Sequence, residues 1–361
     1  MNSTFFIILF AVFASFLVPS VCYSFIVRGS SRFNGGTSLQ KSAFLPFAAV
    51  TFILSAGLFF VFYTPRDFLT SFSFAELCVP FAAVILIYLS ALYDKTAKFF
   101  PMFLLAGAAA ASTVISDSAA AAVLPFAPIY NRLIICAAWF AFSFIYRFAN
   151  SGDAMLAVQS ATVAAGIAIL AFINAIPMFL GVIGIIFAAA FASLMSFTWH
   201  PSRLHVSAHA ACCFGFILFA PCVWTAAENA GSCVMIYALY FLVDFVWAVT
   251  LRLTFVEKYA AIADNTAYCA AVAEGVPPAS AVAFSFRAQI LLLFLGTFQA
   301  LADNHGSLLL ISVFITVWLL YKLRNAGEGN ANLRDINRQV IEDLQDRVND
   351  IKQYINKDKN F

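Results

Sequence analysis

Long apolar stretches separated by short polar segments are the feature that most limits how this chain can fold. Their lengths are close to the roughly 20 residues that an α-helix needs to cross about 30 Å of hydrocarbon. They lack the alternation of apolar and polar residues that membrane β-strands require. Cutting the sequence at charges and prolines gives spans at approximately 5–27, 43–63, 76–93, 99–115, 130–147, 153–173, 176–199, 206–226, 232–251, 281–301 and 306–321. The sequence therefore predicts an all-α, polytopic membrane bundle of about 11 transmembrane helices.

The composition supports a membrane location and excludes several classes of protein. Hydrophobic residues make up 63% of the 361 positions and charged residues 11%, far from the values of soluble domains. Of the 20 Lys and Arg and 18 Asp and Glu residues, 15 lie in 322–361. The net charge of +2 provides no basic field for nucleic acid. We therefore expect a transmembrane domain over 1–321, a charged tail over 322–361, and no nucleic-acid partner.

The distribution of Lys and Arg between the connections predicts the orientation. Connections after odd-numbered spans contain Arg28, Arg32, Lys41, Lys95, Lys98, Arg147, Arg203, Arg252 and Lys258. Connections after even-numbered spans contain only Arg66 and Arg132. Because cytoplasmic loops carry an excess of Lys and Arg, we expect the odd-numbered connections and the C-terminus in the cytoplasm, and the N-terminus outside.

The tail has the pattern of an amphipathic helix. Its apolar residues recur at intervals of three or four, at Leu333, Ile336, Val340, Leu344, Val348, Ile351 and Ile355. Such a helix can pack on the membrane domain, lie at the membrane surface, or join copies or partners as a short coiled coil. The sequence therefore predicts a cytoplasmic amphipathic helix that offers a surface for homo- or hetero-oligomers.

Charged and amide side chains next to the spans mark two polar sites. Asp244 and Arg252 are eight residues apart, about two helical turns, and so lie roughly on one face. They form either a structural polar pair or part of a polar cavity that faces the cytoplasm. Asn150 and Asp153 flank a glycine where a helix is expected to begin. Their oxygens suit either a helix cap or a Mg²⁺ ion.

Five polar segments follow one another along the chain, next to the ends of the predicted spans. The first is RFNGGTSLQKSAFL at 32–45, and the second, SALYDKTAKFFP, ends the third span with Asp94. The third is FANSGDAM at 148–155, and the fourth is SLMSFTWHPSRLHVSAHAA at 193–211. The fifth combines FLVDFVWAVTLRL at 241–253 with ADNTAYC at 263–269. Together these segments resemble the cytoplasmic loops of the polyprenyl-phosphate N-acetylhexosamine-1-phosphate transferase family.

The likeness extends from residue 28 to about residue 290 and includes several substitutions at family positions. Lys41 stands where the family has an arginine, and Asn150 where it has a metal-binding aspartate. Asp153 matches the second acidic position of that loop, whereas Ala208 replaces the aspartate of the fourth segment. Tyr268 matches a tyrosine, but the two histidines that precede it in the family are absent.

The resemblance implies a reaction and a set of roles. Family members transfer a HexNAc-1-phosphate from a UDP-sugar to undecaprenyl phosphate at the cytoplasmic face of the bacterial inner membrane, with Mg²⁺ bridging the pyrophosphate. The resemblance implies that the catalytic residues are Asp94 and Asp153. It implies that the metal ligands are Asp94 and, more weakly because its side chain is an amide, Asn150. The substrate-binding residues that it implies are Lys41, Arg203, Arg252 and Tyr268.

Two alternatives remain at the level of the sequence. Loss of acidic and histidine positions is also expected of a catalytically inactive descendant that binds polyprenyl phosphate or scaffolds a partner enzyme. A transporter would instead place polar residues at mid-membrane and show internal repeats of hydropathy. The sequence shows no convincing repeat, which favours the active transferase and the inactive descendant over the transporter.

Overall fold

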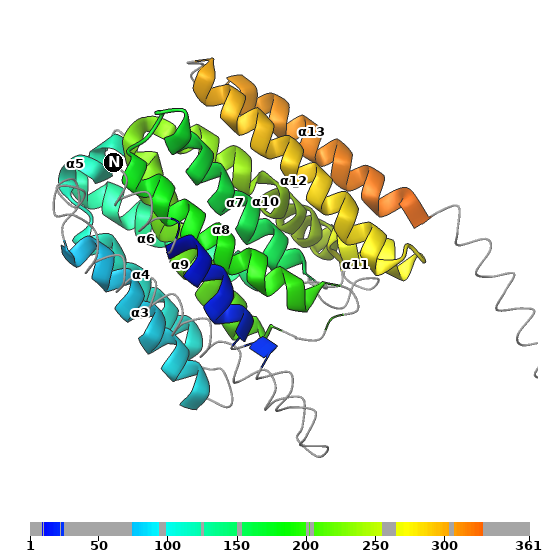
Figure 1. Ribbon diagram of the computed structural model, residues 1–361, viewed down its shortest axis with the longest axis horizontal. Coiled ribbons are helices and arrows are strands. Elements are labelled where there is room, and N and C mark those ends of the chain that lie inside the picture. The colour runs from blue at the N-terminus through cyan, green and yellow to red at the C-terminus, as the bar shows by residue number, and fades with distance from the viewer. Residues whose placement is uncertain are drawn as a thin grey trace, which may run out of the picture.

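The computed structural model describes residues 9, 11–21, 23–24, 74–93, 99–123, 126–149, 154–199, 202, 206–254, 265–302 and 307–327. All regular structure within these ranges is helical, which confirms the predicted all-α class (Figure 1). An N-terminal helix includes Ala11–Val21. The α-helices that follow it are α3 (Phe74–Tyr93), α4 (Phe100–Val114), α5 (Asp117–Val123), α6 (Pro128–Ala149), α7 (Met155–Phe172), α8 (Met178–Thr198), α9 (Ala208–Thr225), α10 (Gly231–Thr254), α11 (Ala267–Ala273), α12 (Pro278–Leu301) and α13 (Ser307–Arg324). A π-helical turn, η2 (Ala226–Ala230), joins α9 to α10, and a 3₁₀ turn, η4 (Asn325–Gly327), follows α13.

The long helices coincide with the predicted spans that fall in the described ranges. Six helical stretches are long and apolar enough to cross a membrane, and one of them, Ala208–Thr254, contains both α9 and α10. The helices α3 and α4 are apolar as well, but their spanning segments are shorter. The predicted span at 43–63 and the predicted tail helix beyond 327 lie outside the described residues. The protein is thus a multi-span helical membrane protein.

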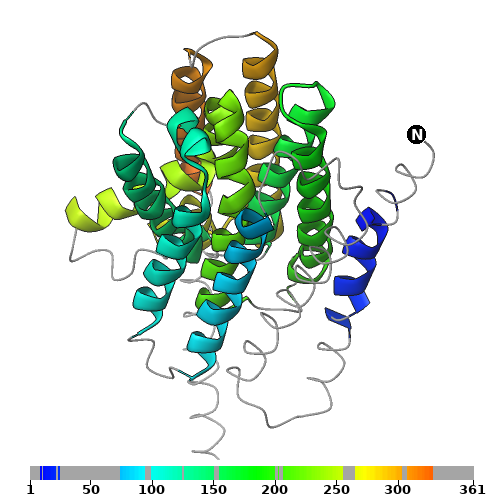
Figure 2. The ribbon, with the colours of Figure 1, turned by 90° about the vertical axis from the view of Figure 1, so that its left-hand side faces the viewer.

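The long α-helices alternate in direction, so the bundle has two distinct ends (Figure 2). One end, called here the polar-loop end, is formed by Tyr93, Phe100, Ala149, Met155, Thr198, Ala208, Thr254, Ala267, Pro278 and Arg324. The opposite end is formed by Phe74, Val114, Pro128, Phe172, Met178, Thr225, Gly231, Leu301 and Ser307. The α3–α4 and α12–α13 pairs lie on opposite flanks of the bundle (Figures 1 and 2).

A break in the backbone separates α9 from α10. Glu228 and Asn229 have non-helical dihedral angles, with φ of 62° at Asn229, where a left-handed conformation suits asparagine. The ring of Phe142 in α6 contacts both Phe219 in α9 and Phe241 in α10. Because one α6 residue meets both helices, α9 and α10 form an antiparallel hairpin and do not continue as one rod.

Small residues bring α7 and α8 together. A Cβ added at Gly184 in α8 would lie 2.8 Å from the Ala164 carbonyl oxygen and 2.8 Å from the Ala168 amide nitrogen, both in α7. Without a driving force for apolar burial in lipid, helices associate through such close van der Waals packing. With neighbours on several sides, α7 is the most enclosed of the six candidate spans among the described residues, with 78% of its residues buried.

Candidate functional site

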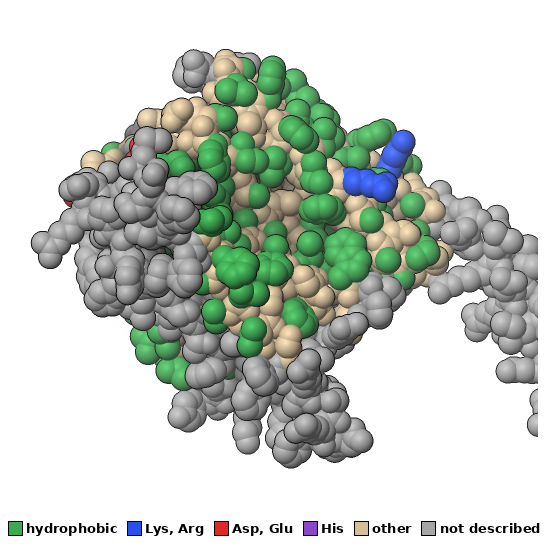
Figure 3. Space-filling model, in the orientation of Figure 1, with side chains coloured by type: hydrophobic (Ala, Val, Ile, Leu, Met, Phe, Trp, Pro, Cys, Tyr) green, Lys and Arg blue, Asp and Glu red, His purple; other side chains and the backbone are tan. Residues whose placement is uncertain are grey.

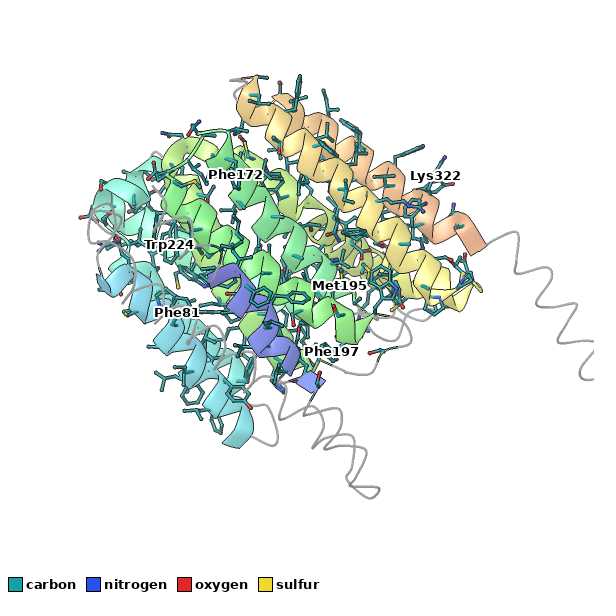
Figure 4. All side chains as sticks on the ribbon, viewed as in Figure 1. Phe81, Phe172, Met195, Phe197, Trp224 and Lys322 are labelled. Atoms are coloured by element: carbon teal, nitrogen blue, oxygen red, sulfur yellow. The ribbon has the colours of Figure 1, made fainter. Side chains whose placement is uncertain are left out.

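Contacts between distant helices hold the polar-loop end together. Tyr23 packs edge-on against Phe197 of α8 at a ring distance of 5.6 Å. Phe100 at the start of α4 meets His209 in the first turn of α9, at 4.5 Å. In Figure 4, Met195 and Phe197 lie at this end, while Phe172 and Trp224 lie at the opposite one. These contacts therefore join the N-terminal helix to α8, and α4 to α9, at the polar-loop end.

A second set of contacts joins the later helices at this end. Phe148, at the end of α6, lies 5.1 Å from Phe245 of α10 by ring centroids. Met155 at the start of α7 shares a buried apolar cluster with Tyr240 and Tyr268, and Trp199 after α8 packs against that cluster. The third, fourth and fifth polar segments thus flank the same group of side chains.

Asp244 supports the start of α11. Its carboxylate oxygen Oδ1 accepts a hydrogen bond of 2.8 Å from the Ala267 amide, and the residue is only 6% exposed. The Thr266 hydroxyl caps the same helix by accepting from the Cys269 amide at 3.5 Å. Because the first amides of a helix have no partners within it, Asp244 orders the segment that carries Tyr268. Arg252 lies two turns further along α10 and is half-buried.

Arg324 connects the last spanning helix to the same segment. Its guanidinium Nη1 donates to the Asn265 carbonyl oxygen at 3.1 Å. Asn265 and Thr266 are both buried, so the connection is sheltered. The end of α13 therefore lies beside the start of α11. The tail boundary predicted at 321/322 falls inside α13, which continues to Arg324.

The predicted site residues are only partly within the described ranges. Tyr268 is 5% exposed and lies in the first turn of α11, and Arg252 lies in the last turn of α10. The other predicted catalytic, substrate-binding and metal-binding residues lie outside the described residues and remain predictions. They are Lys41, Asp94, Asn150, Asp153 and Arg203.

The fit of Mg²⁺ can be examined at one family position. Ala208 is the first residue of α9, directly after Ser207, whose side chain caps the helix by accepting from the Ala210 amide at 3.2 Å. The methyl group of Ala208 offers no oxygen to a hard cation. Across the described residues, no group of three His, Cys, Asp or Glu side chains could hold a metal ion. The predicted ligands Asp94 and Asn150 lie outside the described residues, so the magnesium site stays a prediction.

The structure also shows polar side chains in the bundle interior that the sequence analysis did not single out. The Thr162 hydroxyl of α7 donates to the Gln289 side-chain oxygen of α12, and the Tyr240 and Ser285 hydroxyls lie 2.7 Å apart. Gln159 and Gln289 are 2% and 3% exposed, and Gln159 Oε1 and Gln289 Nε2 lack hydrogen-bond partners among the described residues. Glutamines inside apolar spans were the available signal, because such groups need partners in lipid.

Comparison with known proteins adds no relative to this picture. No protein-family model matches the chain, and no curated protein matches it.

Proposed function

We propose that the protein is a divergent sugar-1-phosphate transferase that acts on a UDP-HexNAc and polyprenyl phosphate in cell-envelope glycan synthesis. One observation supports the proposal: the described helix ends that flank the second, third, fourth and fifth polar segments lie at the polar-loop end. Phosphoryl transfer depends on positioning and charge stabilisation. A transferase of this kind therefore needs segments from distant parts of the sequence on the same side of the membrane. The alternating directions of the helices are compatible with this requirement.

The proposed reaction joins the lipid phosphate to the sugar phosphate. An oxygen of polyprenyl phosphate attacks the sugar-bearing phosphorus of the UDP-sugar, and the bond from that phosphorus to the UMP oxygen breaks. UMP leaves with the bond electrons. Lys41 supplies a point charge for phosphate, whereas Arg203 and Arg252 supply planar forks. Asp94 and Asp153 position the reacting groups. Tyr268 lies in the first turn of α11, the helix whose start is ordered by the hydrogen bond to Asp244.

We also propose the location and orientation. The membrane is the bacterial inner membrane, with the polar-loop end in the cytoplasm. Described cations support this orientation, since Arg147, Arg252, Lys322 and Arg324 are near the polar-loop end and Arg132 is near the opposite end. Arg132 is also neutralised there by an ion pair of 2.8 Å with Asp117.

A second candidate is a non-catalytic protein that binds polyprenyl phosphate or scaffolds a partner enzyme. Ala208 favours it, because a methyl group stands where the family has a carboxylate. In this candidate the cations still attract the lipid phosphate, but no UMP is released. Binding is then insensitive to EDTA, since no metal ion takes part.

Release of UMP from UDP-HexNAc by purified protein and undecaprenyl phosphate tests the first candidate. We expect product above a protein-free control, and at least about a tenfold loss in Arg203→Ala, the scale of one charge-assisted hydrogen bond. Arg132→Ala, at the opposite end, serves as the matched control and should retain activity.

Binding of undecaprenyl phosphate in the same preparation separates the two candidates. EDTA-insensitive binding without UMP, across several UDP-sugars, would select the non-catalytic candidate. Neither binding nor UMP release would reject both. If the protein is the non-catalytic candidate, we expect Asn150→Asp/Ala208→Asp to make ligand binding dependent on Mg²⁺. If metal binding did not change in this variant, our account of the lost carboxylates would be contradicted.

A further inference from the structure

The outer face of α12 and α13 is poorly covered by the rest of the described bundle. Only 22% of the residues in the spanning segment of α13 are buried, and 39% in α12. The side chains that these helices turn outward are mostly large and apolar, among them Phe294, Phe298 and Phe314. Figure 3 shows this face as a largely hydrophobic surface. Charged groups on it therefore call for an explanation.

Two cations interrupt this apolar face. Arg287 of α12 and Lys322 of α13 are both exposed, and Figure 3 shows the Lys and Arg side chains of this face gathered in one place over the two helices. Lys322 Nζ lies 4.4 Å from the centroid of the Trp318 ring, and Figure 4 shows where it lies on α13. Among the described residues, neither cation has a carboxylate within ion-pair distance.

The two cations lie at the same depth. Arg287 is 14 residues before the end of α12 at Leu301, and Lys322 is 15 residues after the start of α13 at Ser307. At a rise of about 1.5 Å per residue, these separations are roughly 21 and 22 Å from the opposite end. Because α12 and α13 are antiparallel neighbours, the level of Arg287 on one helix matches that of Lys322 on the other.

That depth lies inside the edge of the hydrocarbon layer at the polar-loop end, because roughly 21 to 22 Å is shorter than the roughly 30 Å that the layer measures. Exposed Trp318 and Tyr321 are next to Lys322 on α13, and Trp and Tyr are enriched where lipid tails meet headgroups. Long basic side chains near span ends extend to this interface. An arginine fork and a lysine ammonium side by side match a phosphate diester, which Arg binds through two parallel hydrogen bonds.

We infer that Arg287, Lys322 and Trp318 form a binding site for the headgroup of an anionic membrane phospholipid, on the outer face of α12 and α13. Charge complementarity selects this occupant: the surrounding face is apolar enough for acyl chains, and its two cations lack a protein counter-ion among the described residues. The site is separate from the proposed transferase surface, so either proposal can fail without the other.

Native mass spectrometry of the full-length protein, released from nanodiscs of mixed phosphatidylglycerol and phosphatidylcholine, tests the inference. We expect phosphatidylglycerol to be retained in preference to phosphatidylcholine. Arg287→Gln/Lys322→Gln should weaken this retention about thirtyfold, from about 1 kcal/mol for each of the two cations near an anionic surface. Equal retention by the wild type and the double variant would overturn the site, as would equal retention of the two lipids.

Matched variants distinguish a specific site from a general effect of charge or folding. Arg147→Gln removes one cation at the same end of another helix and should leave retention unchanged. Arg287→Lys/Lys322→Arg keeps both charges and should restore most of the retention, so a misfolded double Gln variant does not decide the question. Competition by soluble glycerol phosphate at millimolar concentration would show a site for free phosphate and contradict a lipid site.

Discussion

The two faces of α7 are packed by different means. Toward α8, glycines admit the backbone of α7, as at Gly184. Toward α10 and α12, Gly166 and Gly296 instead make room for the ring of Tyr237, whose hydroxyl lies 3.4 Å from the Thr297 hydroxyl. The first interface is apolar and close, and the second contains polar groups. In lipid, close packing and interhelical hydrogen bonds are alternative ways to hold helices together, and this protein uses one on each side of a single helix.

Gly184→Ala is expected to have the largest effect on stability. The new methyl would meet backbone atoms of Ala164 and Ala168 at 2.8 Å, and backbone cannot move aside without displacing the helix. Overpacking of this kind costs about 3 kcal/mol, at the upper part of the usual range. Unfolding in mixed micelles with increasing dodecyl sulfate measures the loss.

Gly231→Ala is the control for that substitution. Its Cβ would lie 3.4 Å from the Ala226 Cβ, in ordinary contact, and alanine favours the helix by up to about 1 kcal/mol. If both variants unfold at the same detergent fraction, the α7–α8 interface is looser than the structure indicates.

Gly166→Ala sharpens the comparison, because the obstacle is a side chain. The added methyl would lie 2.5 Å from the Tyr237 ring, and we expect a loss of about 2 kcal/mol. Tyr237→Leu in the same chain should recover part of it, since removing the ring opens space. Additive losses in this double-mutant cycle would contradict direct contact.

Thr162→Val tests the polar interface and should have the smallest effect. It leaves the Gln289 oxygen without the Thr162 donor, and interhelical hydrogen bonds in membranes are worth about 0.6 kcal/mol on average. Adding Gln289→Leu should restore stability to near that of the wild type, because both polar partners are then replaced by apolar groups. A loss above that of Gly166→Ala would invert the comparison between the two faces.

The sequence predicted what depends on local pattern. Apolar length alone identified α6 to α10, α12 and α13, and alternation of the spans placed the ends next to Tyr93, Ala149 and Thr198 on one side. Both results follow from lipid, which admits little besides helices. The positions of Asp94, Asn150 and Arg203 relative to one another remain predictions, because these residues lie outside the described ranges.

The sequence did not predict features that depend on tertiary neighbours. The sequence left open whether Asp244 and Arg252 form a structural polar pair or part of a polar cavity. It did not predict that the Asp244 carboxylate accepts a hydrogen bond from the Ala267 amide, which lies 23 residues further along the chain. Thr162 and Gln289 are far apart along the chain, so their hydrogen bond needs the packing of α7 on α12 to be known. The turn between the antiparallel helices α9 and α10 contains a left-handed residue, Asn229, which the pattern of apolar residues does not predict.

The hydrogen bond from Arg324 to the Asn265 carbonyl has a mechanical consequence. This hydrogen bond connects the final turn of α13 to the segment just before α11. A movement of either helix end must therefore break the bond or displace the other end. A restraint on the residues that follow α13 would thus be transmitted through Arg324 to the segment that carries Tyr268.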